Sequence, residues 1–93
     1  MGMYQVINSS KAKKHLENFK KSGSKVILER IDRIYKELQL HPEFGIGKPE
    51  KLKHKHSGQW SREIDKKNRI IYEIKETLVI VYVFSLKGHY GDH

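Results

Sequence analysis

The apolar run at residues 78–86 constrains the fold more than any other segment of the chain. It reads L-V-I-V-Y-V-F-S-L, so apolar side chains stand at consecutive positions and would point to both faces of a strand. A strand that is apolar on both faces is expected inside a sheet, where neighbouring layers cover it. The run is far shorter than the roughly 20 residues that a membrane-spanning helix needs. The sequence therefore predicts a sheet with residues 78–86 as an internal strand.

Two segments that precede this run alternate in the way that half-buried strands do. Residues 59–65 place Trp60 and Ile64 on one face, with Ser61 and Glu63 on the other. In residues 69–75, Ile70, Tyr72 and Ile74 alternate with Arg69, Ile71 and Glu73. Short polar turns at residues 66–68 and 76–77 separate the three strands. Connections this short join antiparallel neighbours. These segments predict an antiparallel meander.

Two amphipathic helices are expected between a first short strand at residues 4–7 and the meander. Residues 11–21 carry apolar side chains at helical spacing with lysines elsewhere, and serines precede both helices as candidate caps. The second helix has the clearer apolar stripe, which consists of Val26, Ile27, Leu28, Ile31, Ile34, Tyr35 and Leu38. The order of elements predicts an α+β fold, in which a helical hairpin packs on one face of a twisted meander. Residues 1–93 are expected to form one domain.

Charge and composition narrow the class of partner. Lys and Arg number 19 against 11 Asp and Glu, which gives a formal charge of +8. Such an excess on a small domain favours a polyanion: RNA, DNA or an anionic membrane. The absence of cysteine excludes a disulfide framework, a cysteine-based zinc site and a thiol nucleophile. No signal peptide is recognisable, so we expect a cytoplasmic protein.

The segment at residues 43–58 is long for so small a domain and is rich in Gly, Lys and His. Long connections in compact domains often carry function. Together with residues 87–93, this segment supplies a carboxylate as a general base, a histidine as a general acid and cations for phosphates. These groups suffice for attack of a ribose 2′-hydroxyl on the adjacent phosphate without a metal. Many basic domains carry such groups, so the set alone does not decide the function.

Four segments make the interpretation specific. They read G-K-P-E-K-L-K-H at residues 47–54, S-G-Q-W-S-R at 57–62, N-R-I-I-Y at 68–72 and K-G-H-Y at 87–90. In this order and spacing they closely resemble the YoeB/Txe family, type II toxins of the RelE superfamily. The resemblance implies a RelE-like, microbial-RNase-like fold. It also implies a metal-independent endoribonuclease that cuts mRNA on the ribosome and inhibits translation.

The resemblance assigns roles by position. Glu50 would be the general base and His89 the general acid, Arg69 would stabilise the transition state, and Tyr90 would orient or stack on the substrate. Four further residues would bind RNA: Lys48, Lys53, His54 and Arg62. No metal or other cofactor is implied. The chain departs from the family at Glu63, where a second arginine is usual.

Partners follow from the same resemblance. We expect a cognate antitoxin of the YefM/Axe kind, mRNA and ribosomal RNA on the ribosome, and operator DNA only through the toxin–antitoxin complex. No membrane contact is expected, and a homodimer is compatible with the family. The alternative is a non-catalytic RNA- or ribosome-binding module of the same fold, which Glu63 favours. A sequence-specific DNA-binding domain is disfavoured, because the second helix is an apolar core helix without base-reading side chains.

Overall fold

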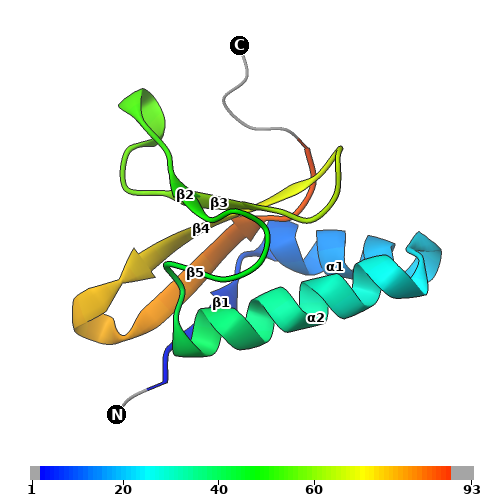
Figure 1. Ribbon diagram of the computed structural model, residues 1–93, viewed down its shortest axis with the longest axis horizontal. Helices are drawn as coiled ribbons and strands as arrows, with labels where there is room; N and C mark the ends of the chain where they lie inside the picture. The colour runs from blue at the N-terminus through cyan, green and yellow to red at the C-terminus, as the bar shows by residue number, and fades with distance from the viewer. Residues whose placement is uncertain (1–2, 89–93) are drawn as a thin grey trace.

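A five-stranded sheet carries two helices on one face in a computed structural model of the chain, which describes residues 3–88 (Figure 1). The elements follow in the order β1 (Gln5–Asn8), α1 (Ser10–Ser22), α2 (Lys25–Leu40), β2 (Glu50–Lys51), β3 (Trp60–Glu63), β4 (Arg69–Lys75) and β5 (Ile80–Ser85). Two short 3₁₀ helices, His54–His56 and Glu76–Leu78, lie in the connections.

The strands are ordered β1-β5-β4-β3-β2 across the sheet. β1 runs parallel to β5, and the other neighbours are antiparallel. β5 therefore has a partner on both sides, which confirms the predicted internal strand. The predicted start at residue 78 is wrong, because Leu78 ends a 3₁₀ helix and Val79 has a left-handed φ of 55°, so the strand begins at Ile80. The predicted α+β fold is confirmed, with β3, β4 and β5 as the meander. The sheet is mixed because α1 and α2 connect β1 to β2 at the opposite edge of the sheet. The meander then leads back from there, and its last strand, β5, pairs in parallel with β1.

The helices begin where serine side chains cap them. The hydroxyl of Ser9 accepts a hydrogen bond from the Ala12 N–H at 3.0 Å, and that of Ser24 accepts one from the Ile27 N–H at 3.2 Å. Each cap satisfies a backbone donor that the first helical turn leaves without a partner. The two predicted capping sites are thus confirmed.

The core lies between the helices and the sheet. Its buried side chains include Ile31, Ile34 and Leu38 of α2 with Ile70, Tyr72, Val81 and Val83 of the sheet. The prediction is wrong for Val26, which is 73% exposed. Consecutive helical residues are turned by about 100° from one another, so the run Val26-Ile27-Leu28 cannot face the sheet as a whole.

The long connection after α2 also differs from its prediction as an irregular loop. It contains β2, a two-residue edge strand that pairs with β3. Two residues are too few to show an alternating pattern in the sequence. In space, β2 forms the edge of the sheet opposite β1, and the 3₁₀ helix after it lies beyond that edge, away from α1 and α2 (Figure 1).

Candidate active site

Four polar side chains share the sheet face opposite the helices. In the antiparallel register Glu50 pairs with Ser61, and Glu63 pairs with Arg69. Paired residues in a sheet point to the same face, and alternate residues along a strand do so too. Ser61 and Glu63 alternate along β3, so all four side chains stand together. The intervening positions, such as Ile70, point into the core instead.

Arg69 joins the members of this group. Its Nε donates a hydrogen bond to the Ser61 hydroxyl at 3.2 Å, and its Nη2 lies 3.9 Å from Oε2 of Glu50. The Arg69 side chain is 24% exposed and that of Glu50 is 62% exposed. The structure therefore brings together the two residues predicted to supply the base and the phosphate-binding cation. A carboxylate and a guanidinium in this arrangement can take a proton and hold a phosphate side by side.

The chain returns to Arg69 at the end of the described residues. The Arg69 N–H donates to the Gly88 carbonyl at 3.2 Å, and the Gly88 N–H donates to Oδ1 of Asn68 at 3.1 Å. Asp65 in turn accepts hydrogen bonds from the backbone and side chain of Asn68, which makes a tight turn between β3 and β4. The residue before His89 is thus fixed beside Arg69.

His89 and Tyr90 lie outside the described residues, so their predicted roles stay predictions. Three of the side chains predicted to bind RNA flank β2, and all three are exposed: Lys48, Lys53 and His54. Lys48 and His54 adopt left-handed backbone angles, with φ of 51° and 61°. These three side chains are accessible to a nucleic acid, and their binding of RNA also remains a prediction.

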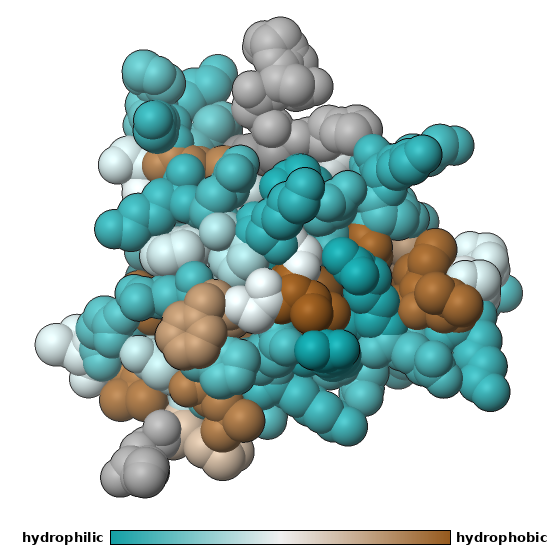
Figure 2. Space-filling model, in the orientation of Figure 1, coloured by the Kyte–Doolittle hydropathy of each residue, from teal (hydrophilic) through white to brown (hydrophobic). Residues whose placement is uncertain are grey.

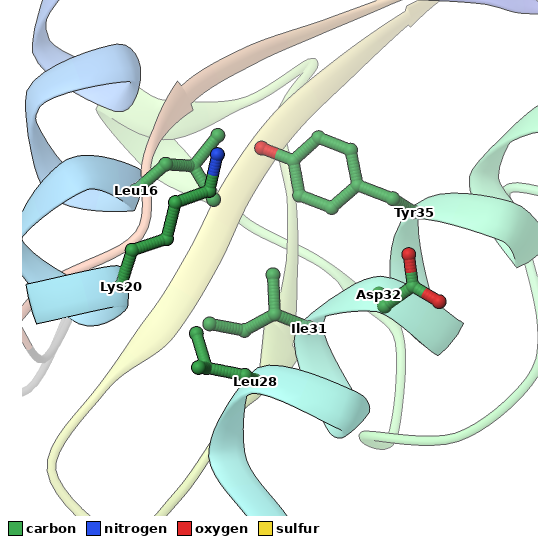
Figure 3. A pocket seen from close by; sticks show the side chains of 6 residues that line it. All are labelled: Leu16, Lys20, Leu28, Ile31, Asp32 and Tyr35. Atoms are coloured by element: carbon green, nitrogen blue, oxygen red, sulfur yellow. The ribbon is translucent and has the colours of Figure 1, made fainter. Parts of the chain in front are cut away.

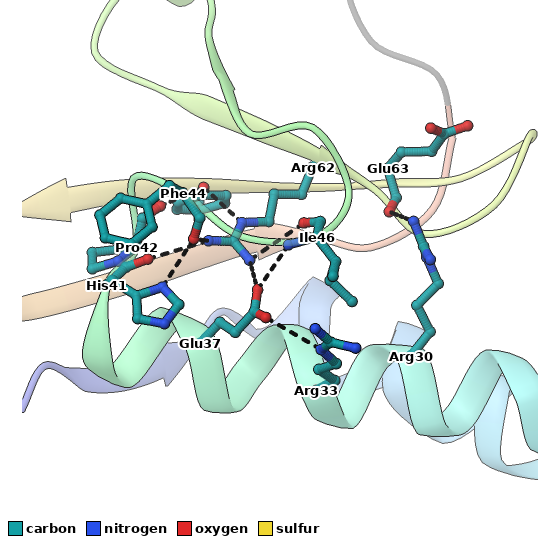
Figure 4. Close-up of polar contacts among 10 residues, drawn as sticks. Arg30, Arg33, Glu37, His41, Pro42, Phe44, Ile46, Arg62 and Glu63 are labelled. Atoms are coloured by element: carbon teal, nitrogen blue, oxygen red, sulfur yellow. Dashed lines mark hydrogen bonds and ion pairs between the residues drawn. The ribbon is translucent and has the colours of Figure 1, made fainter.

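The prediction for Arg62 needs correction, because this residue is fully buried. Figure 4 shows the polar contacts that surround it. Its Nη1 donates to Oε1 of Glu37 at 2.8 Å, its Nη2 to the Phe44 carbonyl at 2.7 Å and its Nε to the Tyr72 hydroxyl at 3.2 Å. A guanidinium enclosed in this way cannot reach RNA. Alternation with the core residue Ile64 was the sequence signal that placed Arg62 on the buried face.

Glu37 is the counter-ion of Arg62 and has no counterpart among the predicted site residues. Burial raises the pKa of Glu37, but hydrogen bonds from the Ile46 N–H, Arg62 and Arg33 outweigh this effect, and the net pKa is lowered. The carboxylate is therefore held in its charged form, as a buried arginine requires.

A hollow of about 360 Å³ lies between α1 and α2 (Figure 3). Its lining is mainly apolar and consists of Leu16, Lys20, Leu28, Ile31, Asp32 and Tyr35. The hollow belongs to the helical layer, whereas Glu50 and Arg69 lie on the opposite face of the sheet. The polar group on the sheet is the better candidate for chemistry, because it combines a carboxylate with a guanidinium.

No group of three or more His, Asp or Glu side chains within residues 3–88 could hold a metal ion. Within the same residues, no helix is long and apolar enough to cross a membrane. The visible surface is dominated by hydrophilic side chains with scattered apolar ones (Figure 2), as the charge of +8 leads one to expect.

Sequence comparisons match the chain to one family. A family model described as the YoeB-like toxin of bacterial type II toxin-antitoxin systems matches residues 9–90. The toxin YoeB of Synechocystis sp. is 38% identical over 68 residues, which cover 73% of this chain and 77% of that protein. The toxin YoeB of Escherichia coli K12 is 37% identical over 57 residues, which cover 61% of this chain and 68% of that protein.

Solved structures share the fold. A YoeB dimer from Staphylococcus aureus superposes with a TM-score of 0.80 at 28% identity, covering 94% of this chain and 98% of that one. A YoeB–YefM complex from the same organism gives 0.78 with the same identity and coverage. A YoeB/ParE toxin from Agrobacterium tumefaciens gives 0.84 at 24% identity, covering 92% of this chain and 99% of that one, and shows the likeness of fold alone.

Proposed function

This chain belongs to the YoeB-like toxins of bacterial type II toxin-antitoxin systems, and from that membership we propose that it is a ribosome-dependent mRNA endoribonuclease. Toxins of this family are generally ribonucleases. The observation that carries the proposal for this chain is the placement of Glu50 within 3.9 Å of Arg69 on the sheet face opposite the helices. A base and a phosphate-binding cation are the two groups that cleavage by a ribose hydroxyl needs first.

In the first half of the reaction, Glu50 takes the proton of the 2′-hydroxyl. The 2′-oxygen then forms a bond to the adjacent phosphorus, and negative charge accumulates on the phosphate oxygens. Arg69 stabilises that charge with its planar array of donors. The Ser61 hydroxyl, which accepts from Nε of Arg69, holds the guanidinium in place for this task.

In the second half, the bond from phosphorus to the 5′-oxygen breaks. His89 donates a proton to the leaving 5′-oxygen, so that the products are a 2′,3′-cyclic phosphate and a 5′-hydroxyl. Tyr90 stacks on or orients a nucleotide next to the cleaved bond. No metal takes part in this scheme, because the cationic side chains supply the stabilisation.

Binding of RNA rests on the exposed cations near β2. Lys48 and Lys53 contact phosphates of the mRNA or of ribosomal RNA, and His54 adds a further contact. Such contacts release counterions, so binding weakens steeply as the salt concentration rises. The ribosomal substrate places the protein in the cytoplasm. We propose that residues 1–93 act as a single toxin domain.

An antitoxin of the YefM kind is the proposed regulator. The S. aureus YoeB–YefM complex is a solved structure of a protein with this fold at 28% identity, which supports such a partner here. A segment of the antitoxin would fold over the basic surface and block it. The complex would bind its operator chiefly through the antitoxin, and a homodimer like that of the S. aureus toxin is compatible with this scheme.

Glu63 favours a second candidate function, a non-catalytic RNA- or ribosome-binding module. Glu63 stands directly across from Arg69 in the register of β3 and β4. An anion at this position repels a phosphate approaching Arg69, which would weaken catalysis more than remote binding.

The two candidates are separated by the chemistry of the RNA ends. A defined mRNA is incubated with the protein, with and without translating ribosomes, and new ends are mapped by primer extension. The endoribonuclease predicts cuts at ribosome-bound codons, 2′,3′-cyclic phosphates upstream and 5′-hydroxyls downstream. Ribosome binding without new ends would support the binding module and contradict the proposed enzyme.

A further inference from the structure

Arg62 is a fully buried cation with a partner at each guanidinium nitrogen. Burying a charge is costly unless hydrogen bonds and a counter-ion compensate for the lost water. The core position of Arg62 could hold an apolar side chain, as the neighbouring Ile64 does. The cost of the charge therefore raises the question of what the guanidinium holds in place.

Most of its partners belong to one connection, the residues between α2 and β2. Nη2 donates to the carbonyls of Phe44 at 2.7 Å and His41 at 3.4 Å, and Nη1 reaches the Ile46 carbonyl at 3.5 Å (Figure 4). Glu37 binds the same connection, because its Oε1 accepts a hydrogen bond from the Ile46 N–H at 3.0 Å. One ion pair thus binds the connection through four of its backbone groups.

Tyr72 and the backbone of β3 complete the attachment. The Tyr72 hydroxyl accepts from Nε of Arg62 and donates to the Pro42 carbonyl at 2.8 Å. The Glu63 N–H donates to the Gly47 carbonyl at 2.6 Å. Residues 41–47 are therefore held from the core at both ends.

Two glycines let the connection approach the ion pair. A Cβ on Gly45 would overlap Oε1 of Glu37, and one on Gly47 would stand 2.8 Å from the Glu63 carbonyl oxygen. Both glycines have positive φ, 134° and 85°, which other residues rarely adopt. Glycine at these two positions therefore allows the backbone of the connection to pack directly against Glu37 and β3.

The held connection leads straight to Glu50. Only Lys48 and Pro49 separate Glu50 from Gly47. The strand β2, which begins at Glu50, pairs with β3 over two residues. So short an edge strand adds little stability by itself. We propose that Arg62, through its pairing with Glu37, is a positioning residue that holds residues 41–47 and thereby places Glu50 beside Arg69. The expected effect on kcat rests on the proposed function, whereas the placement of Glu50 by Arg62 can be tested without it.

The test compares Arg62→Lys with Arg33→Lys. Arg33 contacts the same Glu37 carboxylate through its other oxygen at 3.3 Å, but its side chain is 66% exposed. Lysine keeps the charge in both variants and loses the fork of donors. Circular dichroism and thermal unfolding establish that each variant folds. Amide hydrogen exchange then reports on Ile46 and on Leu52, whose N–H donates to the Gln59 carbonyl just beyond Glu50.

We expect faster exchange at Ile46 and Leu52 in Arg62→Lys, together with a kcat for ribosome-bound mRNA about 10- to 100-fold lower. KM should change by less than about threefold, because the RNA-binding cations are untouched. Arg33→Lys should match wild type in both respects. A folded Arg62→Lys protein with wild-type exchange at these amides and wild-type kcat would overturn the inference.

A second variant serves if Arg62→Lys fails to fold. Glu37→Gln keeps the size of the side chain and an oxygen for the Ile46 N–H, but removes the counter-charge. It should show the same two effects, and a folded Glu37→Gln protein identical to wild type would count against the inference. Should the wild-type protein cut no mRNA, the proposed function fails, and exchange at Leu52 still decides whether Arg62 holds the segment that bears Glu50.

Discussion

Glu50 and Arg69 stand on strands that do not pair with each other, yet their charged groups approach to 3.9 Å. β3 lies between them and contributes Ser61, whose small side chain lets Arg69 reach across the strand. An exposed ion pair whose charged atoms are this far apart stabilises a fold by less than about 1 kcal/mol. The ion pair therefore contributes little to the stability of the fold. Its importance lies in what the carboxylate and the guanidinium can bind together.

Arg69→Lys should abolish most of the cleavage without unfolding the protein. Lysine keeps one charge but cannot present two parallel donors to a phosphate, so we expect the single-turnover rate on ribosome-bound mRNA to fall about 100- to 1,000-fold. Thermal unfolding should be nearly unchanged, and Arg33→Lys provides the control for the substitution itself. A folded Arg69→Lys protein that cuts at the wild-type rate would remove Arg69 from the proposed mechanism.

Glu63→Gln should strengthen RNA binding. The change removes an anion directly across from Arg69, and one charge at this range is worth about 1 kcal/mol in water. We expect a Kd for short single-stranded RNA about 2- to 5-fold lower at low salt, with the gain shrinking at high salt. Fluorescence anisotropy measures both. The exposed Glu29 of α2 supplies the control, and an equal gain in Glu29→Gln would show that net charge alone is responsible.

Much of the fold was predictable from local patterns. Residues 69–75 alternate cleanly and form β4 with the predicted bounds, and the stripe of the second helix identified its core residues Ile31, Ile34 and Leu38. Such elements can be predicted from the sequence, because the periodicity of apolar residues indicates which face of a helix or strand is buried. β2 escaped prediction because two residues carry no period, and its pairing depends on β3.

The site was predictable only in part. The spacing of motifs singled out Glu50 and Arg69, which the fold brings together. Arg62 was misplaced on the surface, because an arginine in a strand is usually solvated and its partner Glu37 lies 25 residues earlier in the chain. Long-range pairing of this kind leaves no local signature. The alternation of Arg62 with core residues was the one available sign.

Stability should fall as the solution becomes acidic, in part because of His15. The Leu86 N–H donates to Nδ1 of His15 at 3.0 Å, which requires an unprotonated nitrogen. Burial, together with Lys87 and Lys11, lowers the pKa of His15. The unfolded chain then binds more protons than the folded one, so this contribution is intact above about pH 6.5 and is lost below it.

Urea unfolding at about pH 7.5 and about pH 5 measures the effect. His15→Gln should lose less free energy of unfolding between these pH values than wild type does. The same change at the exposed His54 serves as the control and should leave the wild-type decline in place. An undiminished decline in His15→Gln would contradict the role assigned to the Leu86 contact.

Tyr72→Phe should destabilise the fold by about 1–3 kcal/mol. The substitution leaves the buried Pro42 carbonyl without its donor and Nε of Arg62 without its acceptor. Denaturant unfolding measures the change. Tyr82→Phe is the control, since the Tyr82 hydroxyl has no hydrogen bond within residues 3–88. Equal stability of Tyr72→Phe and wild type would show that the hydroxyl does not support the connection after α2.

The most direct test is primer extension on a defined mRNA in a translating extract, with wild type, Glu50→Gln and Glu43→Gln. Glutamine keeps the shape of Glu50 but cannot take the 2′-hydroxyl proton, so cuts at ribosome-bound codons should fall about 100-fold or more. Glu43 is exposed in the same connection, and Glu43→Gln should cut like wild type. Wild-type cutting by Glu50→Gln would contradict its role as the base. The absence of cuts by the wild-type protein itself, with ribosome binding intact, would contradict the proposed enzyme.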